Sequence, residues 1–444
     1  MLRFVAWVRR QRLPMLAYAH LPLSWRRRLS AFVRGSTVRP LRFTRTGAWA
    51  TSASGTRPEF GDALRGSGPG VNIVGYVRGD FGLAESARLY ANALIKAGVP
   101  VSFFDVDASP VAGRSNHVPV DAVSESLPYG TCFVFVNPDR LRGVLARIGS
   151  ERLRGKHLVA CWFWELERVP DAWLAETLLI DEFLVPSRFI ADAIRHATDK
   201  PLLKVPQPVC DRADSGLQRP DFGLEEGKFI FLVTFDFNSV YERKNPMGAV
   251  RAFTRAFERS RDDVRLLIKS TNGSGYTDSM AQLLEAAASD PRIVVRDDRI
   301  DRVHMVALQR CCDAVISLHR AEGFGLGLAE CMRMGKPVVA TRWSGNIDFM
   351  DDGNSCLVDC RLVPVDSSQY PGARDARWAD PDIEDAARHM RRLVDEPGFA
   401  SSLGERAAAS IRRSHGDSHA GELIRTRLQQ LAETHPGDGT GDFA

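Results

Sequence analysis

The chain has 444 residues, of which 44% are hydrophobic and 26% are charged. This is ordinary globular composition, which excludes collagen-like and low-complexity chains. At about 150 residues per domain, the length predicts two or three domains. The eight cysteines form no C-x-x-C pair and have no suitably spaced histidines, so we expect reduced thiols and no zinc site.

The net charge of +4 is unevenly distributed. Residues 1–60 contain twelve arginines, no lysine and one acidic residue, Glu59, whereas the rest of the chain is mildly acidic. This asymmetry predicts an anionic membrane surface as the partner of residues 1–60, whose Trp, Leu and Phe side chains suit interfacial helices. A basic tail without a partner and a helix packed on the body are the alternatives. Nucleic acid is not expected, because no known nucleic-acid-binding module follows.

No apolar stretch approaches the roughly 20 residues that a membrane-spanning helix needs. A signal peptide is not expected either, because Arg9, Arg10, Arg12 and Pro14 interrupt the apolar segments near the start. We therefore expect a cytoplasmic protein that attaches peripherally to the inner face of the cytoplasmic membrane through residues 1–60.

A Ser-, Gly- and Pro-rich linker at residues 46–70 precedes alternating apolar and helical patterns. The predicted strands are residues 71–77, 101–107, 131–137, 156–164 and 181–186, and the predicted helices are residues 83–98 and 187–197. Ser187 is expected to cap the second of these helices. The alternation predicts a parallel sheet with helices on both faces.

Residues 207–227 are polar and contain proline, so they form the best internal domain boundary. Beyond them the predicted strands are 228–237, 264–270, 292–298, 313–319 and 336–341, and the predicted helices are 245–257, 280–289, 305–312, 326–335, 382–396 and 402–432. Two such α/β units predict two lobes. Ligands bind outside the carboxyl ends of the strands, so a cleft between the lobes is the expected site.

The strongest motif is the strand–turn–helix sequence at residues 313–341. Its glycines let backbone amides approach an anion, and the start of the helix adds a favourable dipole. Glu322 lies in the turn and Glu330 lies on the helix, and carboxylates are good acceptors for vicinal hydroxyls. A turn whose glycines serve only packing is the alternative. The full Glu-Gly-Phe-Gly-x-x-x-x-Glu pattern favours a sugar–diphosphate–nucleoside ligand.

This pattern resembles the large family of retaining glycosyltransferases of GT-B fold, family 4, over about residues 71–430. The resemblance implies an α/β fold of the GT-B type, with two Rossmann-like doubly wound domains facing a central cleft. It implies that Glu322 contacts the donor sugar and Glu330 the nucleotide ribose. The turn residues expected to bind the sugar and the diphosphate are Gly323, Phe324, Gly325, Leu326 and Gly327.

Arg243 and Lys244 follow the first strand of the second unit, just before a predicted helix. Adjacent cations at such a turn can neutralise a leaving diphosphate, and an exposed basic pair is the alternative. The resemblance implies phosphate binding at this position. Lys269, at the end of the next strand, is a further donor-site candidate, with a solvated strand end as its alternative. Ser344 and Asn346 are expected in a loop near the nucleotide.

In the first unit, Gly82 and Glu85 follow the first strand, where the family has a loop facing the cleft; a plain turn is the alternative. Trp164 and Glu165 belong to a C-W-F-W-E segment that resembles a bacterial subgroup acting on polysaccharide and lipopolysaccharide. Many relatives carry a histidine near this point, and this chain does not. Glu165 either positions an acceptor hydroxyl or is a salt-bridged residue among buried aromatics.

The resemblance therefore implies a retaining hexosyltransferase, with Arg243, Lys244 and Glu322 as its catalytic residues. The donor is a nucleoside-diphosphate sugar, with GDP-mannose or a deoxyhexose favoured, and the acceptor is a lipid-linked or polysaccharide hydroxyl. A nucleotide-sugar-binding protein without transferase activity and a nucleotide-sugar epimerase are the alternatives. No cofactor and no metal are expected, because no D-x-D motif follows a strand suitably and the two cations already supply positive charge.

The predicted domains follow from this assignment. They are a basic head and linker at residues 1–70, an acceptor-side Rossmann-like domain at 71–206, an interdomain linker at 207–227, a donor-binding Rossmann-like domain at 228–416, and a C-terminal helix and tail at 417–444.

Overall fold

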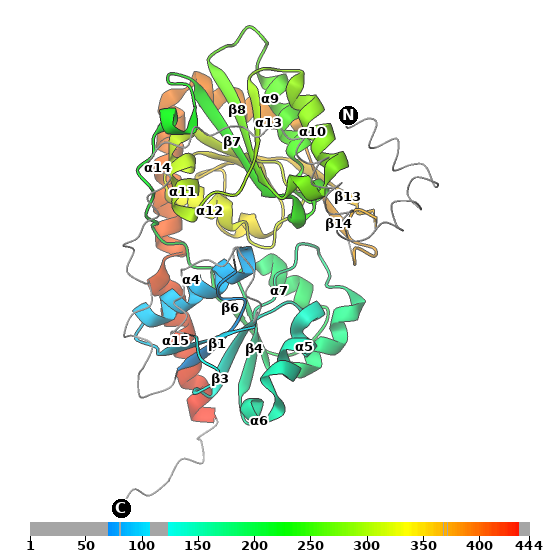
Figure 1. Cartoon of the computed structure of the whole chain (residues 1–444), viewed down its shortest axis with the longest axis vertical. Coiled ribbons are helices and arrows are strands. Elements are labelled where there is room, and N and C mark those ends of the chain that lie inside the picture. Colours follow the sequence, from blue (N-terminus) through cyan, green and yellow to red (C-terminus); the bar gives the residue numbers. More distant parts are fainter. Residues whose placement is uncertain (1–69, 80, 107–122, 367, 371, 435–444) are drawn as a thin grey trace, which may run out of the picture.

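The computed structural model describes residues 70–79, 81–106, 123–366, 368–370 and 372–434. The chain forms two lobes, each with a parallel sheet at its centre (Figure 1). The predicted membrane-binding segment, residues 1–60, lies outside the described residues. Within the described ranges, no helix is both long and apolar enough to cross a membrane.

The first lobe is built on a six-stranded parallel sheet of order β2-β1-β3-β4-β5-β6. Its strands are β1 (Val71–Gly75), β2 (Val101–Asp105), β3 (Thr131–Phe135), β4 (His157–Ala160), β5 (Glu182–Val185) and β6 (Leu202–Lys204). Its helices are α4 (Gly82–Lys96), α5 (Pro138–Ile148), α6 (Ser150–Leu153), α7 (Arg188–Arg195) and the 3₁₀ segment η4 (Asp171–Leu179). Strands β1, β2 and β3 are buried throughout, because helices cover both faces of the sheet.

Two details of the first lobe bear on the sequence predictions. The Ser187 side chain accepts a hydrogen bond of 3.2 Å from the Ile190 amide, which confirms the predicted N-cap of α7. The strand predicted at 156–164 was too long, since β4 ends at Ala160. The aromatic residues that follow Ala160 therefore form a loop at the carboxyl end of the sheet.

The second lobe has a six-stranded sheet of order β12-β11-β10-β7-β8-β9. Its strands are β7 (Phe229–Asp236), β8 (Val264–Thr271), β9 (Ile293–Asp297), β10 (Ala314–Ser317), β11 (Val338–Thr341) and β12 (Cys356–Val358). Its helices include α8 (Tyr241–Lys244), α9 (Pro246–Ala256), α10 (Thr277–Ala288), α11 (Arg302–Cys311) and α12 (Leu326–Arg333). Four further 3₁₀ segments lie in the connections: η5 (Arg219–Phe222), η6 (Phe237–Ser239), η7 (Gly273–Gly275) and η8 (Gly345–Asp348).

The strand orders fix where a ligand can bind. In the first sheet the chain moves from β1 to one side and then returns to place β3 on the other side. In the second sheet β8 and β10 flank β7 in the same manner. Crevices form where the order reverses, at the carboxyl ends of the strands. The loops that follow β1, β3, β7 and β10 are therefore placed to line a ligand site.

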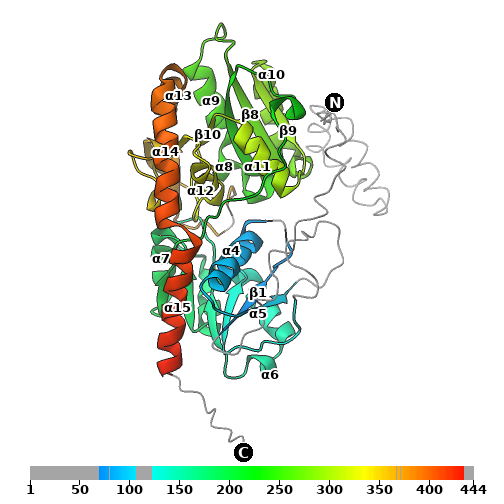
Figure 2. The ribbon, with the colours of Figure 1, turned by 90° about the vertical axis from the view of Figure 1, so that its left-hand side faces the viewer.

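The end of the chain joins the two lobes. The helical pattern predicted at 402–432 is not continuous, because α14 (Pro397–Ser414) ends before Gly416 and α15 (Asp417–Thr434) begins after it. Helix α13 (Ile383–Asp395) precedes them. Figure 2 shows α14 beside the second lobe and α15 beside the first. Helix α15 packs closely on α4, since a Cβ on Gly421 would stand 2.4 Å from the Ala93 carbonyl oxygen.

A two-stranded antiparallel hairpin was not predicted from the sequence. It consists of β13 (Cys360–Pro364) and β14 (Arg377–Pro381), and it branches from the second lobe after β12. The Ala379 amide donates to the Arg320 carbonyl over 2.8 Å, which attaches the hairpin to the segment that follows β10.

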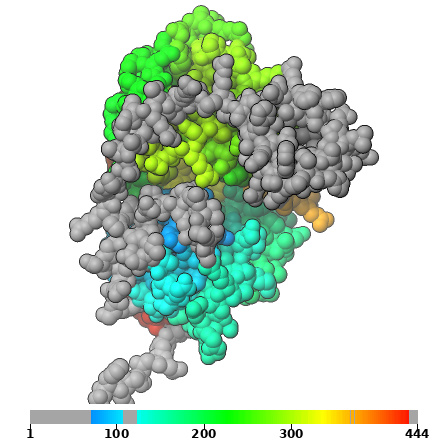
Figure 3. Space-filling view, in the orientation of Figure 1, coloured from blue at the N-terminus to red at the C-terminus, as the bar shows by residue number. Residues whose placement is uncertain are grey.

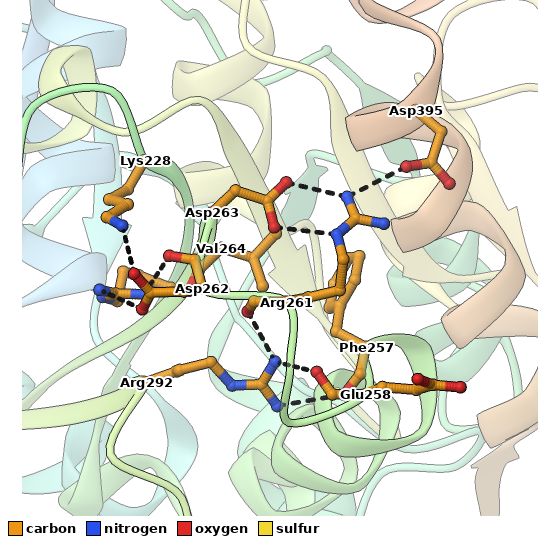
Figure 4. Close-up of polar contacts among 10 residues, drawn as sticks. Lys228, Phe257, Glu258, Arg261, Asp262, Asp263, Val264, Arg292 and Asp395 are labelled. Atoms are coloured by element: carbon orange, nitrogen blue, oxygen red, sulfur yellow. Dashed lines mark hydrogen bonds and ion pairs between the residues drawn. The ribbon is translucent and has the colours of Figure 1, made fainter.

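Polar contacts close the end of the second sheet that lies opposite the strand carboxyl ends (Figure 4). The guanidinium of buried Arg292 donates to three carbonyls, those of Phe257 at the C-cap of α9 and of Glu258 and Arg261 in the loop after it. Arg261 pairs with Asp263 at 2.9 Å and with Asp395 at 3.2 Å. The Arg292 contacts satisfy carbonyls of the C-cap of α9 and of the loop after it. All of these contacts lie at the strand starts rather than at the crevice.

Candidate active site

A cavity of about 870 Å³ lies between the lobes, at the carboxyl ends of both sheets. Its volume falls within the range typical of small-molecule sites. The space-filling view shows the second lobe, in green and yellow, above the first lobe, in blue and cyan (Figure 3). The lining residues include Tyr76, Arg78, Phe81, Gly82, Asp105, Trp164, Glu165, Asp236, Arg243, Lys244, Arg299, Glu322, Gly323, Phe324, Gly325, Leu326, Gly327 and Tyr370.

The predicted glycine turn forms part of the second-lobe wall. Gly325 is the N-cap of α12 with a φ of 93°, a left-handed conformation that glycine adopts without strain. Leu326 and Gly327 occupy the first two helical positions, whose amides have no partner within a helix. Among the described residues no side chain caps α12, so these amides are available to an anion in the cavity.

Two donor-site candidates, Ser344 and Asn346, support this turn but do not line the cavity. The Ser344 hydroxyl accepts a hydrogen bond of 2.8 Å from the Glu322 amide. The buried Asn346 donates to the Thr341 carbonyl over 2.9 Å and contacts His319 at 3.0 Å. Between these residues, a Cβ on Gly345 would stand 1.9 Å from the Gly323 carbonyl oxygen. The loop at residues 344–346 therefore supports the glycine turn without lining the cavity itself.

The predicted cations lie in the short helix α8. Asn245 has a φ of 48°, and its side chain caps α9 by accepting from the Gly248 amide over 3.1 Å. Arg243 is buried, and its guanidinium donates to the Ala321 carbonyl over 2.9 Å and lies 3.2 Å from the Glu322 carboxylate. Lys244 forms an ion pair with the same carboxylate. Both cations and Glu322 line the cavity.

The charges of this cluster determine its protonation. Burial by itself would raise the pKa of Glu322, but the charges of Lys244 and Arg243 outweigh it and lower the pKa to about 2. Burial lowers the pKa of Lys244, although Glu322 opposes that shift. Glu322 is therefore an ionised acceptor at neutral pH and has no proton to donate.

Glu330, the expected ribose contact, does not line the cavity in this structure. It is buried on α12, where it pairs with Arg212 at 3.2 Å and also with Arg302. Arg212, from the interdomain linker, pairs in addition with Glu85 on α4 of the first lobe. Glu85 likewise does not line the cavity. These two candidates thus meet in an ion cluster that joins the lobes.

Lys269, also a donor-site candidate, lies away from the cavity wall. Its buried ammonium group is 2.9 Å from the Asp298 carboxylate and donates to the Ser270 carbonyl over 3.1 Å. These contacts connect the ends of β8 and β9. Lys269 therefore links the ends of two neighbouring strands.

On the first-lobe side, Gly82, Trp164 and Glu165 line the cavity as the sequence patterns suggested. Trp164 is buried, and its indole nitrogen donates to the Arg168 carbonyl over 2.6 Å. Glu165 is about one quarter exposed and lies 3.5 Å from the Arg243 guanidinium. The aromatic packing and the salt bridge expected for this segment are therefore both present, and the carboxylate also faces the cavity.

Several cavity residues were missed by the sequence analysis. Arg78 pairs with Asp105 at 2.6 Å across the ends of β1 and β2, and both belong to segments that the strand pattern could have marked. Phe81 also lines the cavity and is nearly half exposed. Tyr370 and Arg299 carry no local signal, because each comes from a connection that only the fold brings to the cavity. The described residues contain no group of three His, Cys, Asp or Glu side chains that could hold a metal ion.

Comparisons with known proteins agree with this architecture. The chain is similar to Anabaena HepE, solved in complex with UDP and glucose, at a TM-score of 0.58 and 15% identity. The match covers 82% of this chain and 100% of that one. The sucrose-phosphate synthase of Thermosynechococcus elongatus matches equally well, at a TM-score of 0.58, 14% identity and the same coverage. These neighbours establish the fold, two Rossmann-like domains of the GT-B type.

Curated relatives match over shorter lengths. A D-inositol 3-phosphate glycosyltransferase of Arthrobacter sp. is 27% identical over 191 residues, which are 43% of this chain and 40% of the relative. A trehalose synthase of Rubrobacter xylanophilus is 24% identical over 174 residues, which are 38% of this chain and 36% of the relative. The chain thus spans well under half of the length of these two relatives.

The family comparison covers the second lobe and part of the first. Residues 188–410, half of the chain, match the model described as family 4 glycosyltransferase in conflict systems. The matched range contains the cation pair of α8, the glycine turn and both carboxylates of the Glu-Gly-Phe-Gly pattern. The chain therefore belongs to the glycosyltransferases of family 4.

Proposed function

We propose that this chain is a retaining hexosyltransferase that moves a hexose from a nucleoside diphosphate to a hydroxyl of a lipid-linked or polysaccharide acceptor. One observation carries the proposal. The free amides at the start of α12, the cations Arg243 and Lys244, and the ionised Glu322 line one cavity between the lobes. This set matches a ligand that carries an anionic diphosphate and a neutral, hydroxyl-rich sugar.

The proposed reaction breaks the bond between C1 of the sugar and the diphosphate oxygen. Negative charge develops on the departing diphosphate, beside Lys244, Arg243 and the amides of Leu326 and Gly327, and stabilising this charge is the main electrostatic task. The acceptor hydroxyl forms the new bond to C1 on the same face, and its proton passes to the leaving diphosphate. Glu322 accepts hydrogen bonds from the donor sugar, since its low pKa keeps it ionised.

Two similarities bear on the choice of donor, and they favour different nucleotide bases. The resemblance of the C-W-F-W-E segment favours GDP-mannose or a deoxyhexose donor. The Anabaena neighbour was crystallised with UDP and glucose, which supports a uridine nucleotide. No metal and no cofactor enter the proposed reaction, because the cations of α8 supply the positive charge that a metal would bring.

A screen of sugar nucleotides by thermal stabilisation tests the donor assignment. A ligand present at 100 times its dissociation constant adds about 2.7 kcal/mol to the stability of the folded chain. We expect stabilisation by sugar nucleotides of one base, and release of free nucleoside diphosphate that depends on acceptor. Epimerised donor without such release favours the epimerase alternative, and binding without turnover across acceptors favours a silent binding protein.

The membrane-binding role of residues 1–60 is part of the proposal and rests on their arginine-rich, aromatic composition. Vesicle flotation compares the full chain with one that lacks these residues. We expect salt-sensitive flotation of the full chain on anionic vesicles only. Equal flotation of both chains contradicts this role.

A further inference from the structure

One aromatic residue in the cavity comes from an unexpected part of the chain. Tyr370 lies in the connection between β13 and β14, which we call the strap (residues 365–376, of which 367 and 371 are outside the description). The hairpin that carries the strap is anchored to the second lobe through Arg320 and Ala379. The strap itself belongs to the hydrophobic core of the first lobe, together with Trp164.

The strap is closely packed against the loop that follows β4. The Tyr370 and Trp164 rings meet edge to face, with centroids 5.3 Å apart. Gly372 has a φ of 77°, and a Cβ there would stand 2.7 Å from the ring of Pro170. Arg377 pairs with Glu167 at 3.0 Å. These contacts fix the strap against the aromatic loop and bury the Tyr370 ring.

The Tyr370 hydroxyl is directed to a carboxylate of the site. It donates a hydrogen bond to one oxygen of Glu165, whose other oxygen lies 3.5 Å from the Arg243 guanidinium. The other terminal nitrogen of that guanidinium lies 3.2 Å from Glu322. Burial and the neighbouring Glu165 raise the pKa of Tyr370, so the phenol keeps the proton that it donates. A continuous line of polar contacts thus runs from the strap to the cations.

Resting on the proposed function, we infer that Tyr370 is a positioning residue: through Glu165 it holds the Arg243 guanidinium where the leaving diphosphate develops its charge. The first-lobe carboxylate and the second-lobe cation approach each other across the cleft, and the strap fixes the carboxylate from behind. The cation is therefore in place before the reaction begins, which is the form of electrostatic stabilisation that costs no reorganisation in the transition state.

Tyr370→Phe tests this role, because it keeps the ring in the aromatic cluster and removes only the hydroxyl. We expect kcat for transfer to fall about tenfold, the effect of losing one hydrogen bond to a charged group, with the donor KM nearly unchanged. Tyr90→Phe is the matched control. Its hydroxyl is also buried and donates to the Val205 carbonyl over 2.8 Å, outside the cavity lining. It should lower the melting temperature and leave kcat unchanged.

A double-mutant cycle with Glu165→Gln separates positioning from simple loss of structure. If Tyr370 acts through Glu165, Tyr370→Phe has little further effect on kcat in the Glu165→Gln background. Full activity of Tyr370→Phe, or effects of the two changes that multiply independently, would overturn the inference. A wild-type chain that transfers no sugar from any donor instead overturns the proposed function, so the two failures are distinguishable.

Discussion

Two of the ion clusters between the lobes are centred on an arginine, and they differ in whether they line the cavity. The first is centred on Arg243, which lies between Glu322 of its own lobe and Glu165 of the other. The second is centred on Arg212, which lies between Glu85 and Glu330. Both consist of largely buried arginines and carboxylates that cross the boundary between the lobes.

Their surroundings differ. The Arg243 cluster lines the cavity beside the first amides of α12, so its charges face the cavity. The Arg212 cluster lies outside the cavity lining, and its charges neutralise one another. Similar residue types thus line the proposed donor site in one place and join the lobes in the other. The comparison predicts that changes to the first cluster act on turnover, whereas changes to the second act on stability.

The largest expected effect follows from Lys244→Ala. Losing one group that stabilises the developing charge should lower kcat by about 100- to 1000-fold, by analogy with the loss of one oxyanion-hole donor. Steady-state transfer kinetics check this. Lys228→Ala is the control, because this lysine pairs with Asp262 at 2.7 Å at the far end of the sheet (Figure 4). Similar rates for both variants would remove the assignment of phosphate binding to α8.

Glu322→Gln is expected to lower kcat by about 10- to 100-fold, because a neutral amide oxygen accepts hydrogen bonds from the sugar more weakly than a carboxylate does in the transition state. The same change removes the carboxylate that pairs with Lys244 and leaves Arg243 with Glu165 alone. The free nucleoside diphosphate should therefore bind at least as tightly as to the wild type, as measured by titration calorimetry. Markedly weaker binding would show that Glu322 serves to build the anion site rather than to contact the sugar.

Arg212→Met is expected to change kcat by less than about threefold and to lower the free energy of unfolding by about 1–3 kcal/mol. The reason is that Glu85 and Glu330 lose a hydrogen-bonded counter-charge. Urea unfolding and transfer kinetics on the same preparation compare the two quantities. A large loss of kcat with unchanged stability would move the Arg212 cluster into the catalytic machinery.

The smallest expected effect is on the pH dependence of stability, which also tests whether the Arg212 cluster stabilises the fold. Burial alone would raise the pKa of Glu85, but Arg212 and Arg88 lower it from 4.5 to about 2. This depressed pKa contributes stability that is present above pH 4.5 and is lost as the pH falls towards 2. The stability difference between wild type and Arg212→Met should therefore shrink over this range. A difference that is independent of pH would show that Arg212 does not stabilise the ionised Glu85.

The second-lobe wall of the cavity could be predicted from sequence because its signals are local. The glycine turn and the α8 cations each follow one strand within a few residues, and the carboxyl ends of parallel strands meet at one edge of the sheet. Lys269 follows the same rule, yet its ammonium group turns to Asp298. The position of a residue at a strand end predicts the edge of the sheet on which its side chain lies. The residue with which that side chain pairs depends on the neighbouring loop.

The amino-acid sequence by itself determined the two α/β units, most of their strands and the acidic, glycine-rich turn of family 4, because periodicity and turn chemistry act over a few residues. Tertiary structure alone decided that the last helical pattern breaks and that α15 returns to the first lobe. It also decided that Arg212 pairs with two carboxylates and that Tyr370 lies beside Glu165. Each depends on surfaces far apart in the chain that meet only when the lobes are assembled. Such contacts leave no periodic trace in the segments that make them.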